Sequence, residues 1–135
     1  MKVRLIVLLL AAVALMSVAD IQLQAHHSFA ATYFEDKTER IEGDLVQFLF
    51  RNPHSFVHVE VKDATGQVTR YAVEWGGGGQ LGRSGVTRET LKAGDHVIIV
   101  GNPGRNPDDH RLRMMRLQRP VDNYTWGTRP GETFD

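Results

Sequence analysis

Residues 55–75 read SFVHVEVKDATGQVTRYAVEW, the clearest pattern of strand, turn and strand in the chain. Valine occupies every second position from 57 to 61, which predicts a half-buried strand over residues 55–62. The turn sequence Asp-Ala-Thr-Gly follows at 63–66. Residues 68–75 are therefore predicted to return as a second strand, antiparallel to the first.

Three further strands are predicted on either side of this hairpin. Residues 41–50 carry apolar side chains on both parities, which indicates a long strand that bends at Gly43 and serves two sheets. Residues 96–102 contain the run Val-Ile-Ile-Val and are predicted to form a buried strand. The last strand is predicted over residues 111–119, with a bulge where the alternation slips at the Met-Met pair.

The segment between the third and fourth strands has two parts. Residues 76–86 hold six glycines, so we expect irregular structure there. Residues 87–92 (TRETLK) are predicted to form one helical turn with Thr87 as its N-cap. Five strands with a short helix between the third and fourth is the order of the OB-fold. The predicted class is therefore all-β, a small five-stranded OB-like (Greek-key) barrel.

The N-terminal segment has the pattern of a secretory signal peptide. Lys2 and Arg4 precede an apolar run of residues 5–16, which is too short to span a membrane. Cleavage is expected after Ala25 or after Ala19. The predicted organisation is a signal peptide at 1–25, an N-terminal arm at 26–37, a barrel at 38–119 and a C-terminal tail at 120–135. We expect a periplasmic or secreted protein without a stable membrane anchor.

Composition excludes several classes of function. The 135 residues include 16 basic and 16 acidic side chains and no cysteine. The absence of cysteine excludes a cysteine-ligated zinc site, thiol catalysis and attachment of c-type haem. The balanced charge argues against non-specific binding to nucleic acid. The expected partners are a small ligand or an exported protein, and no nucleic acid.

Histidines near the expected N-terminus suggest a metal site. If cleavage follows Ala25, His26 offers its α-amine and its imidazole to one ion, and His27, His54 or His58 could supply a third nitrogen. His54 and His58 lie about 13 Å apart in a regular strand, so both cannot ligate one ion, and His54 is preferred. The candidate ligands are His26, His27 and His54, and the candidate cofactor is copper or zinc. The alternative is a solvated terminus with surface histidines.

A second set of candidate residues would bind an organic ligand. Phe56 and Tyr71 are expected to line a groove, and the glycine-rich stretch could cover a pocket next to Glu74 and Trp75. The chain has no Gly-x-Ser-x-Gly or His-Glu-x-x-His motif and no recognised pair of catalytic carboxylates. We therefore expect a binding or accessory protein without catalysis of its own, with metal binding as the alternative.

Three segments carry a resemblance to a known group of proteins. They are AHHSFA at 25–30, RNPHSFVHVEVKD at 51–63 and TRETLKAGDHV at 87–97. With its Ala-His-His-Ser-Phe start and its Asn-Pro-His before a strand, the chain resembles a family of small exported bacterial proteins of unknown function. The resemblance implies export and implies no particular reaction.

Overall fold

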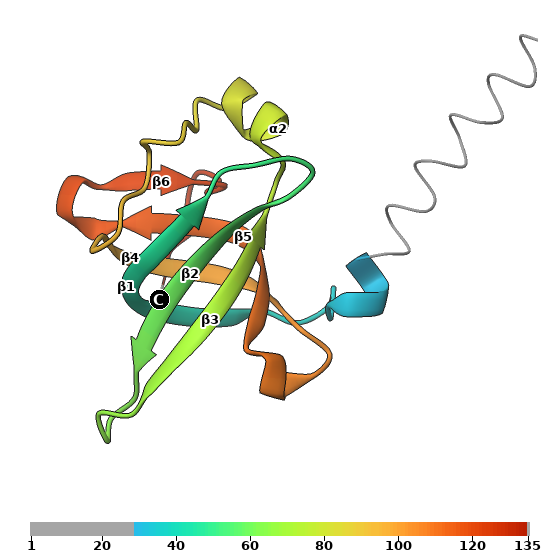
Figure 1. Ribbon diagram of the computed structural model, residues 1–135, viewed down its shortest axis with the longest axis vertical. Helices are drawn as coiled ribbons and strands as arrows, with labels where there is room; N and C mark the ends of the chain where they lie inside the picture. The colour runs from blue at the N-terminus through green and yellow to red at the C-terminus, as the bar shows by residue number, and fades with distance from the viewer. Residues whose placement is uncertain (1–28, 135) are drawn as a thin grey trace, which may run out of the picture. The chain divides into compact units, whose positions relative to one another are not determined.

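The computed structural model describes residues 29–134 and divides the chain into two units, Met1–Thr32 and Tyr33–Asp135. In the first unit, residues 29–32 are helical. The second unit contains all the strands (Figure 1). Among the described residues, we find no helix that combines the length and the apolar character needed to cross a bilayer. The predicted signal peptide and its cleavage points lie outside the described residues.

The strands of the second unit form a closed barrel. The antiparallel pairs are β1–β2, β2–β3, β1–β4 and β4–β5, and a short parallel pairing of β3 with β5 closes the barrel. This connectivity is that of a Greek-key OB barrel, so the predicted fold class is confirmed. The elements are β1 (Glu39–Leu49), β2 (Ser55–Lys62), β3 (Val68–Trp75), α2 (Gly78–Arg83), β4 (His96–Pro103), η1 (Pro107–Asp109), β5 (Arg111–Arg119), η2 (Pro120–Asp122) and β6 (Tyr124–Trp126).

Strand β1 bends and serves two sheets, as its two-sided apolar pattern predicted. Its first half, Glu39–Asp44, pairs with β4, and its second half, from Asp44 onward, pairs with β2. A Cβ atom added at Gly43 would lie 2.1 Å from the backbone oxygen of Glu60. The bend therefore requires glycine, because any side chain would collide with the neighbouring strand.

The predicted bulge in β5 is also confirmed. Val100 of β4 pairs with Arg116, whereas the next residue, Gly101, pairs with Met114. Met115 is thus the extra residue of β5, and its side chain is exposed. The inward-facing residues keep their place on both sides of it, since Met114 and Leu117 are both buried.

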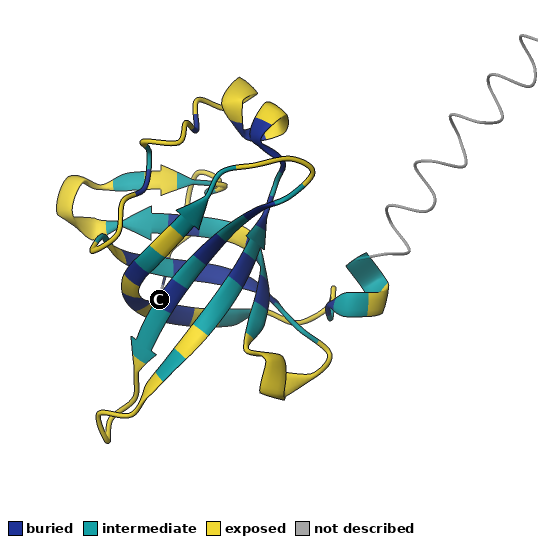
Figure 2. Cartoon of the chain, viewed as in Figure 1, coloured by how far each residue is buried: buried dark blue, intermediate teal, exposed yellow. Residues whose placement is uncertain are grey.

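The core fills the barrel with aliphatic side chains from every strand of the closed sheet. Dark blue segments alternate along the strands in Figure 2, as expected when one face of each strand points inward. The valines of residues 57–61 follow this pattern, because Val57 and Val59 are fully buried. The largest members of the core are Trp75, Ile41, Ile99, Leu45, Leu81, Leu91, Leu112 and Leu117.

The helix between the third and fourth strands lies in a different place from the one predicted. Helix α2 forms within the glycine-rich stretch that was expected to be irregular, and Leu81 anchors it in the core. A Cβ atom at Gly77 would lie 2.5 Å from the backbone oxygen of Pro53, and one at Gly78 would lie 3.1 Å from the ring of Phe50. The glycines thus allow close packing, a tertiary effect that outweighs their poor helix propensity.

Two other segments also differ from the sequence-based expectation. Residues 87–92 form a turn instead of a helical turn, although Thr87 Oγ1 still accepts a hydrogen bond from the backbone N–H of Glu89. The C-terminal segment, which showed no periodicity, contains β6, and this strand pairs antiparallel with β5. Its Trp126 packs against Trp75 with ring centroids 4.9 Å apart, so the barrel gains a sixth strand at its edge.

Candidate binding site around Glu74

Glu74 is the centre of a polar cluster on the outer face of the barrel. It lies on β3 between the buried Val73 and Trp75, so the alternation of the strand turns its side chain outward. On β2, Phe56 is its direct cross-strand partner and shares that face. The Glu74 side chain keeps only 12% of its exposure, because the three groups described next cover it.

His54 reaches Glu74 from the loop before β2. Its Nδ1 lies 2.7 Å from Oε1 of Glu74. The buried Ser55 fixes this loop, because its hydroxyl bonds to the backbone of Arg51 and its N–H donates to the carbonyl of Gly76. The carboxylate of Glu74 therefore holds the imidazole of His54 through Nδ1, and Nε2 points away from Glu74.

Two residues from distant parts of the chain bind the other oxygen of Glu74. The hydroxyl of Tyr33 donates to Oε2 at 2.5 Å, and Nη2 of Arg111 lies 3.1 Å from the same atom. Tyr33 is 1% exposed and is positioned by a backbone bridge to Gly104. Burial, and then the hydrogen bond to Glu74, hold the pKa of Tyr33 well above its usual range. The tyrosine thus remains a proton donor.

Arg111 stands where two hollows of the surface meet. The first hollow, of about 590 Å³, has Phe56, His58 and Arg51 in its lining. The Cζ atoms of Arg51 and Arg111 lie 5.5 and 5.9 Å from the centre of the Phe56 ring. Burial, and then the charges of Arg70 and Arg51, hold the pKa of His58 below its usual value. The ring of Phe56 therefore forms one wall of the first hollow, and the guanidinium groups of Arg51 and Arg111 lie over that ring.

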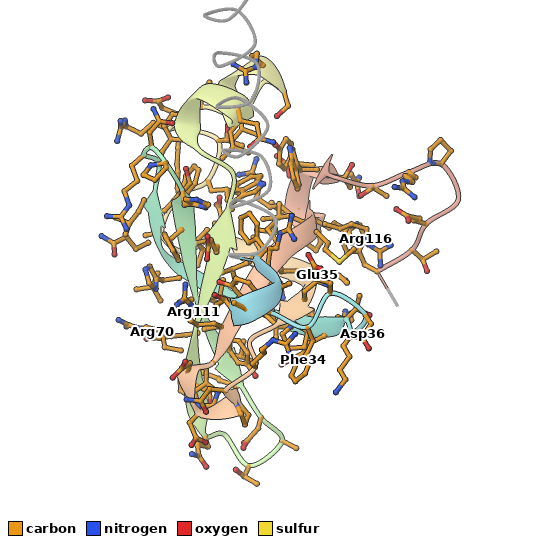
Figure 3. All side chains as sticks on the ribbon, turned by 90° about the vertical axis from the view of Figure 1, so that its right-hand side faces the viewer. Phe34, Glu35, Asp36, Arg70, Arg111 and Arg116 are labelled. Atoms are coloured by element: carbon orange, nitrogen blue, oxygen red, sulfur yellow. The ribbon has the colours of Figure 1, made fainter. Side chains whose placement is uncertain are left out.

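The second hollow, of about 440 Å³, lies between Tyr71 and Phe34. The Tyr71 hydroxyl donates to Glu39 at 2.9 Å, and burial followed by this bond raises the pKa of Tyr71 to about 12. Lys37 Nζ and Arg105 Cζ lie 4.1 and 4.8 Å from the centre of the Phe34 ring. In the view of Figure 3, Arg111 lies between Arg70 of β3 and Phe34.

The predicted ligand-binding residues are thus divided by the structure. Glu74, Phe56 and Tyr71 lie on the outer face, where Phe56 and Tyr71 line the two hollows. Trp75 is 3% exposed and lies in the core against Phe48, so the structure does not bring it to either hollow. Helix α2 packs beside the loop before β2 and does not line either hollow.

The predicted metal ligands are only partly within the structure. His54 is described, whereas His26 and His27 lie outside the described residues. Within residues 29–134, no group of three or more histidine, aspartate or glutamate side chains is arranged to hold a metal ion. His58 lines the Phe56 hollow, whereas His54 binds Glu74, so the two are not brought to one site, as their spacing predicted.

Two residues of the cluster were not found from the sequence. Tyr33 lies in the arm before the barrel, where no periodicity marks it, and Arg111 is the first residue of the last strand, where no motif marks it. The parallel pairing of β3 with β5 brings Arg111 beside Glu74, since Ala72 is the register partner of Arg111. Sequence periodicity contains no signal for such a contact between strands distant in the chain.

Comparison with known proteins gives a structural neighbour and a family. The structure is similar to the mitochondrial single-stranded DNA-binding protein Rim1 of S. cerevisiae. The TM-score is 0.47 and the sequence identity 14%, over 63% of this chain and 94% of that chain. At this identity the likeness concerns the fold alone. The fold is thus shared with a single-stranded DNA-binding protein, and the sequence-based exclusion of nucleic acid is withdrawn.

The sequence comparisons give one match. No curated protein matches the chain. Residues 12–114 match a family described as a family of unknown function, DUF6152. The match covers most of the barrel as well as the segment before it. This small β-barrel chain therefore belongs to the family of unknown function DUF6152.

Proposed function

We propose that this chain is an exported, periplasmic or secreted binding protein without catalysis of its own, and that it binds a copper or zinc ion through His54. Export is supported by the signal-peptide pattern of residues 1–25. The single observation that carries the metal proposal is the 2.7 Å contact between His54 Nδ1 and Glu74 Oε1. A metal-binding histidine usually donates its second ring N–H to a carboxylate in this way.

The surroundings of Glu74 support this role. The Tyr33 hydroxyl and the Arg111 guanidinium both bind Oε2, so the Glu74 carboxylate is fixed in place while Oε1 contacts the imidazole. Because Tyr33 and Arg111 hold the Glu74 carboxylate, that carboxylate orients the ring of His54 before an ion binds. Pre-orientation of this kind lowers the entropic cost of binding the ion.

The remaining ligands of the proposed site are the N-terminal nitrogens. Cleavage after Ala25 would make His26 the first residue and create an α-amine beside an imidazole, a chelating pair suited to Cu²⁺.

The first experiment determines where the mature protein begins. Intact-mass measurement of the protein exported by its native host is expected to give a chain that starts at His26. A start at Asp20 would remove the α-amine from the site and would rule out the version of the proposal that uses it. In that case imidazoles alone would have to bind the ion, with much lower affinity.

The second experiment is a titration of the mature protein with Cu²⁺ and with Zn²⁺. His26→Ala and His54→Ala are each expected to weaken binding of the preferred ion by at least about tenfold, as is usual when one ligand is lost. His96→Gln is the matched control, because His96 also contacts carboxylates, Asp44 at 2.8 Å and Glu42 at 3.1 Å. Equal affinity in the wild type and His54→Ala would refute the proposal, and a loss confined to His96→Gln would move the ion to that surface.

A further inference from the structure

Four basic side chains on the outer face of the barrel are held against aromatic rings. Arg51 and Arg111 lie over Phe56 in the first hollow, and Lys37 and Arg105 lie over Phe34 in the second. A cation placed over an aromatic ring is stabilised there and keeps its charge. The two rings thus act as supports for cations, two for each ring.

The two hollows are continuous in their lining, because Arg111 contributes to both. Arg111 is fixed by its ion pair with Glu74 and by the short parallel pairing of β3 with β5. A ligand that contacts Arg51 at one end and Lys37 at the other would pass over Arg111. The surface therefore fits an extended ligand better than a compact one.

The charge of this surface is cancelled only in part, because Arg111 is paired with Glu74. Among the described residues, neither Arg51 nor Lys37 forms an ion pair through its side chain, which is placed over a ring instead. Each hollow has one carboxylate in its lining besides these cations, Asp109 in the first and Glu39 in the second. Glu39 already accepts the hydrogen bond from the Tyr71 hydroxyl. With Arg111 paired to Glu74, the surface as a whole keeps an excess of cations, Arg51, Lys37 and Arg105 against Asp109 and Glu39.

We infer that this surface binds a linear polyanion, with one anionic group over Phe56 and another over Phe34, joined across Arg111. The ligand is recognised by its charged groups, because the ring contacts of Phe34 and Phe56 are made with cations. This site goes beyond the metal proposal and needs no metal ion. Its residues are Arg51, Phe56, Arg111, Phe34, Lys37 and Arg105.

The test uses a short linear polyphosphate as the probe, titrated into the mature protein in the presence of a chelator that removes metal ions. Polyphosphate is expected to bind much more tightly than inorganic phosphate, because only the chain can reach both hollows. Arg51→Gln and Lys37→Gln are each expected to weaken polyphosphate binding about tenfold, as the loss of a charge-assisted hydrogen bond would. Their effect on inorganic phosphate should be smaller.

Arg88→Gln is the matched control. Arg88 also lies over a phenylalanine ring, 5.7 Å from the centre of Phe50, but it lines neither hollow. This variant should bind polyphosphate like the wild type, whereas Asp109→Asn should bind it more tightly, because a negative charge is removed. Each cation lost from the site should also make binding less sensitive to salt, by about one unit in the slope of log K against log salt.

Three results would overturn the inference. The first is equal affinity for polyphosphate in the wild type and in Arg51→Gln. The second is a loss in Arg88→Gln as large as that in Arg51→Gln, which would indicate attraction to net charge alone. The third is an oligothymidylate that binds far more tightly than polyphosphate of equal charge, since stacking of bases would then dominate. All four variant positions are exposed, and thermal melts check that the variants are folded.

Discussion

Glu74 and Trp75 are neighbours on β3, yet they belong to opposite kinds of surroundings. Glu74 faces outward, where its carboxylate contacts the imidazole of His54, the hydroxyl of Tyr33 and the guanidinium of Arg111. Trp75 faces inward, is 3% exposed, and packs against the rings of Phe48 and Trp126. One step along a strand therefore separates the candidate site from the core.

This contrast shows how a small barrel can carry a polar site without weakening its interior. The hydrogen bonds of Glu74 come from a loop, an arm and a neighbouring strand, and none of these partners enters the barrel. The core on the other side of the same strand is apolar, apart from the indole N–H of Trp75, which has no hydrogen-bond partner among the described residues. We expect substitutions on the two sides to act on different quantities, stability for Trp75 and order of the site for Glu74.

The largest effect is expected from Trp75→Ala. Removal of this buried ring should lower the free energy of unfolding by about 3–5 kcal/mol, because the surrounding core cannot close the cavity completely. Urea denaturation followed by circular dichroism measures the loss. The cost should be much smaller, below about 1.5 kcal/mol, for Trp75→Phe, which keeps an aromatic ring and removes the N–H that has no partner. Similar losses in both variants would contradict the assignment of Trp75 to the core.

The core side of this comparison could be predicted from the sequence, because it depends on alternation along single strands. The valines at 57, 59 and 61, the bend at Gly43 and the bulge beside Met114 all leave local signals in the sequence. Strands β2, β3 and β5 begin and end at the predicted residues. Helix α2 could not be predicted in this way, because its glycines are required by close contacts with Phe50 and Pro53, which only the folded chain creates.

The site was only half predictable for a related reason. Glu74 and His54 could be selected as polar residues at the ends of predicted strands, and Phe56 as their aromatic neighbour. Tyr33 and Arg111 reach Glu74 across 41 and 37 positions of the chain. Contacts at such separation depend on how the barrel closes, and a single sequence contains no periodic signal for closure.

An intermediate effect is expected from Tyr33→Phe. The change keeps the buried ring and removes only the hydroxyl that donates to Glu74, so it should lower the free energy of unfolding by about 1.5–3 kcal/mol. Tyr71→Phe is the matched control, because its hydroxyl also donates to a glutamate, Glu39, but in a more exposed place. Its loss should stay near or below about 1 kcal/mol. Equal losses would show that burial of the Glu74 cluster adds nothing to its hydrogen bonds.

The smallest effect is expected where carboxylates meet a histidine in open solvent. His96 lies between Asp44 and Glu42, with Nδ1 2.8 Å from the first and Nε2 3.1 Å from the second. Both contacts are best satisfied by the imidazolium form, since only that form has two N–H donors. The hydrogen bond to Asp44, and then the one to Glu42, raise the pKa of His96 above its ordinary value.

The sign of the pH dependence follows from this raised pKa. The folded state binds the His96 proton more tightly than the unfolded state, so the added stability is complete below the ordinary pKa of about 6.5 and disappears as the pH rises through the folded pKa. Because the side chain is half exposed, the change in the free energy of unfolding should be below about 1 kcal/mol.

Urea midpoints of the wild type and His96→Gln should therefore differ at mildly acidic pH and converge at alkaline pH. His58 acts with the opposite sign, because its lowered pKa removes stability as the pH falls, so only the difference between the two proteins isolates His96. A difference that is constant over the whole range would mean that His96 contributes packing and no charge.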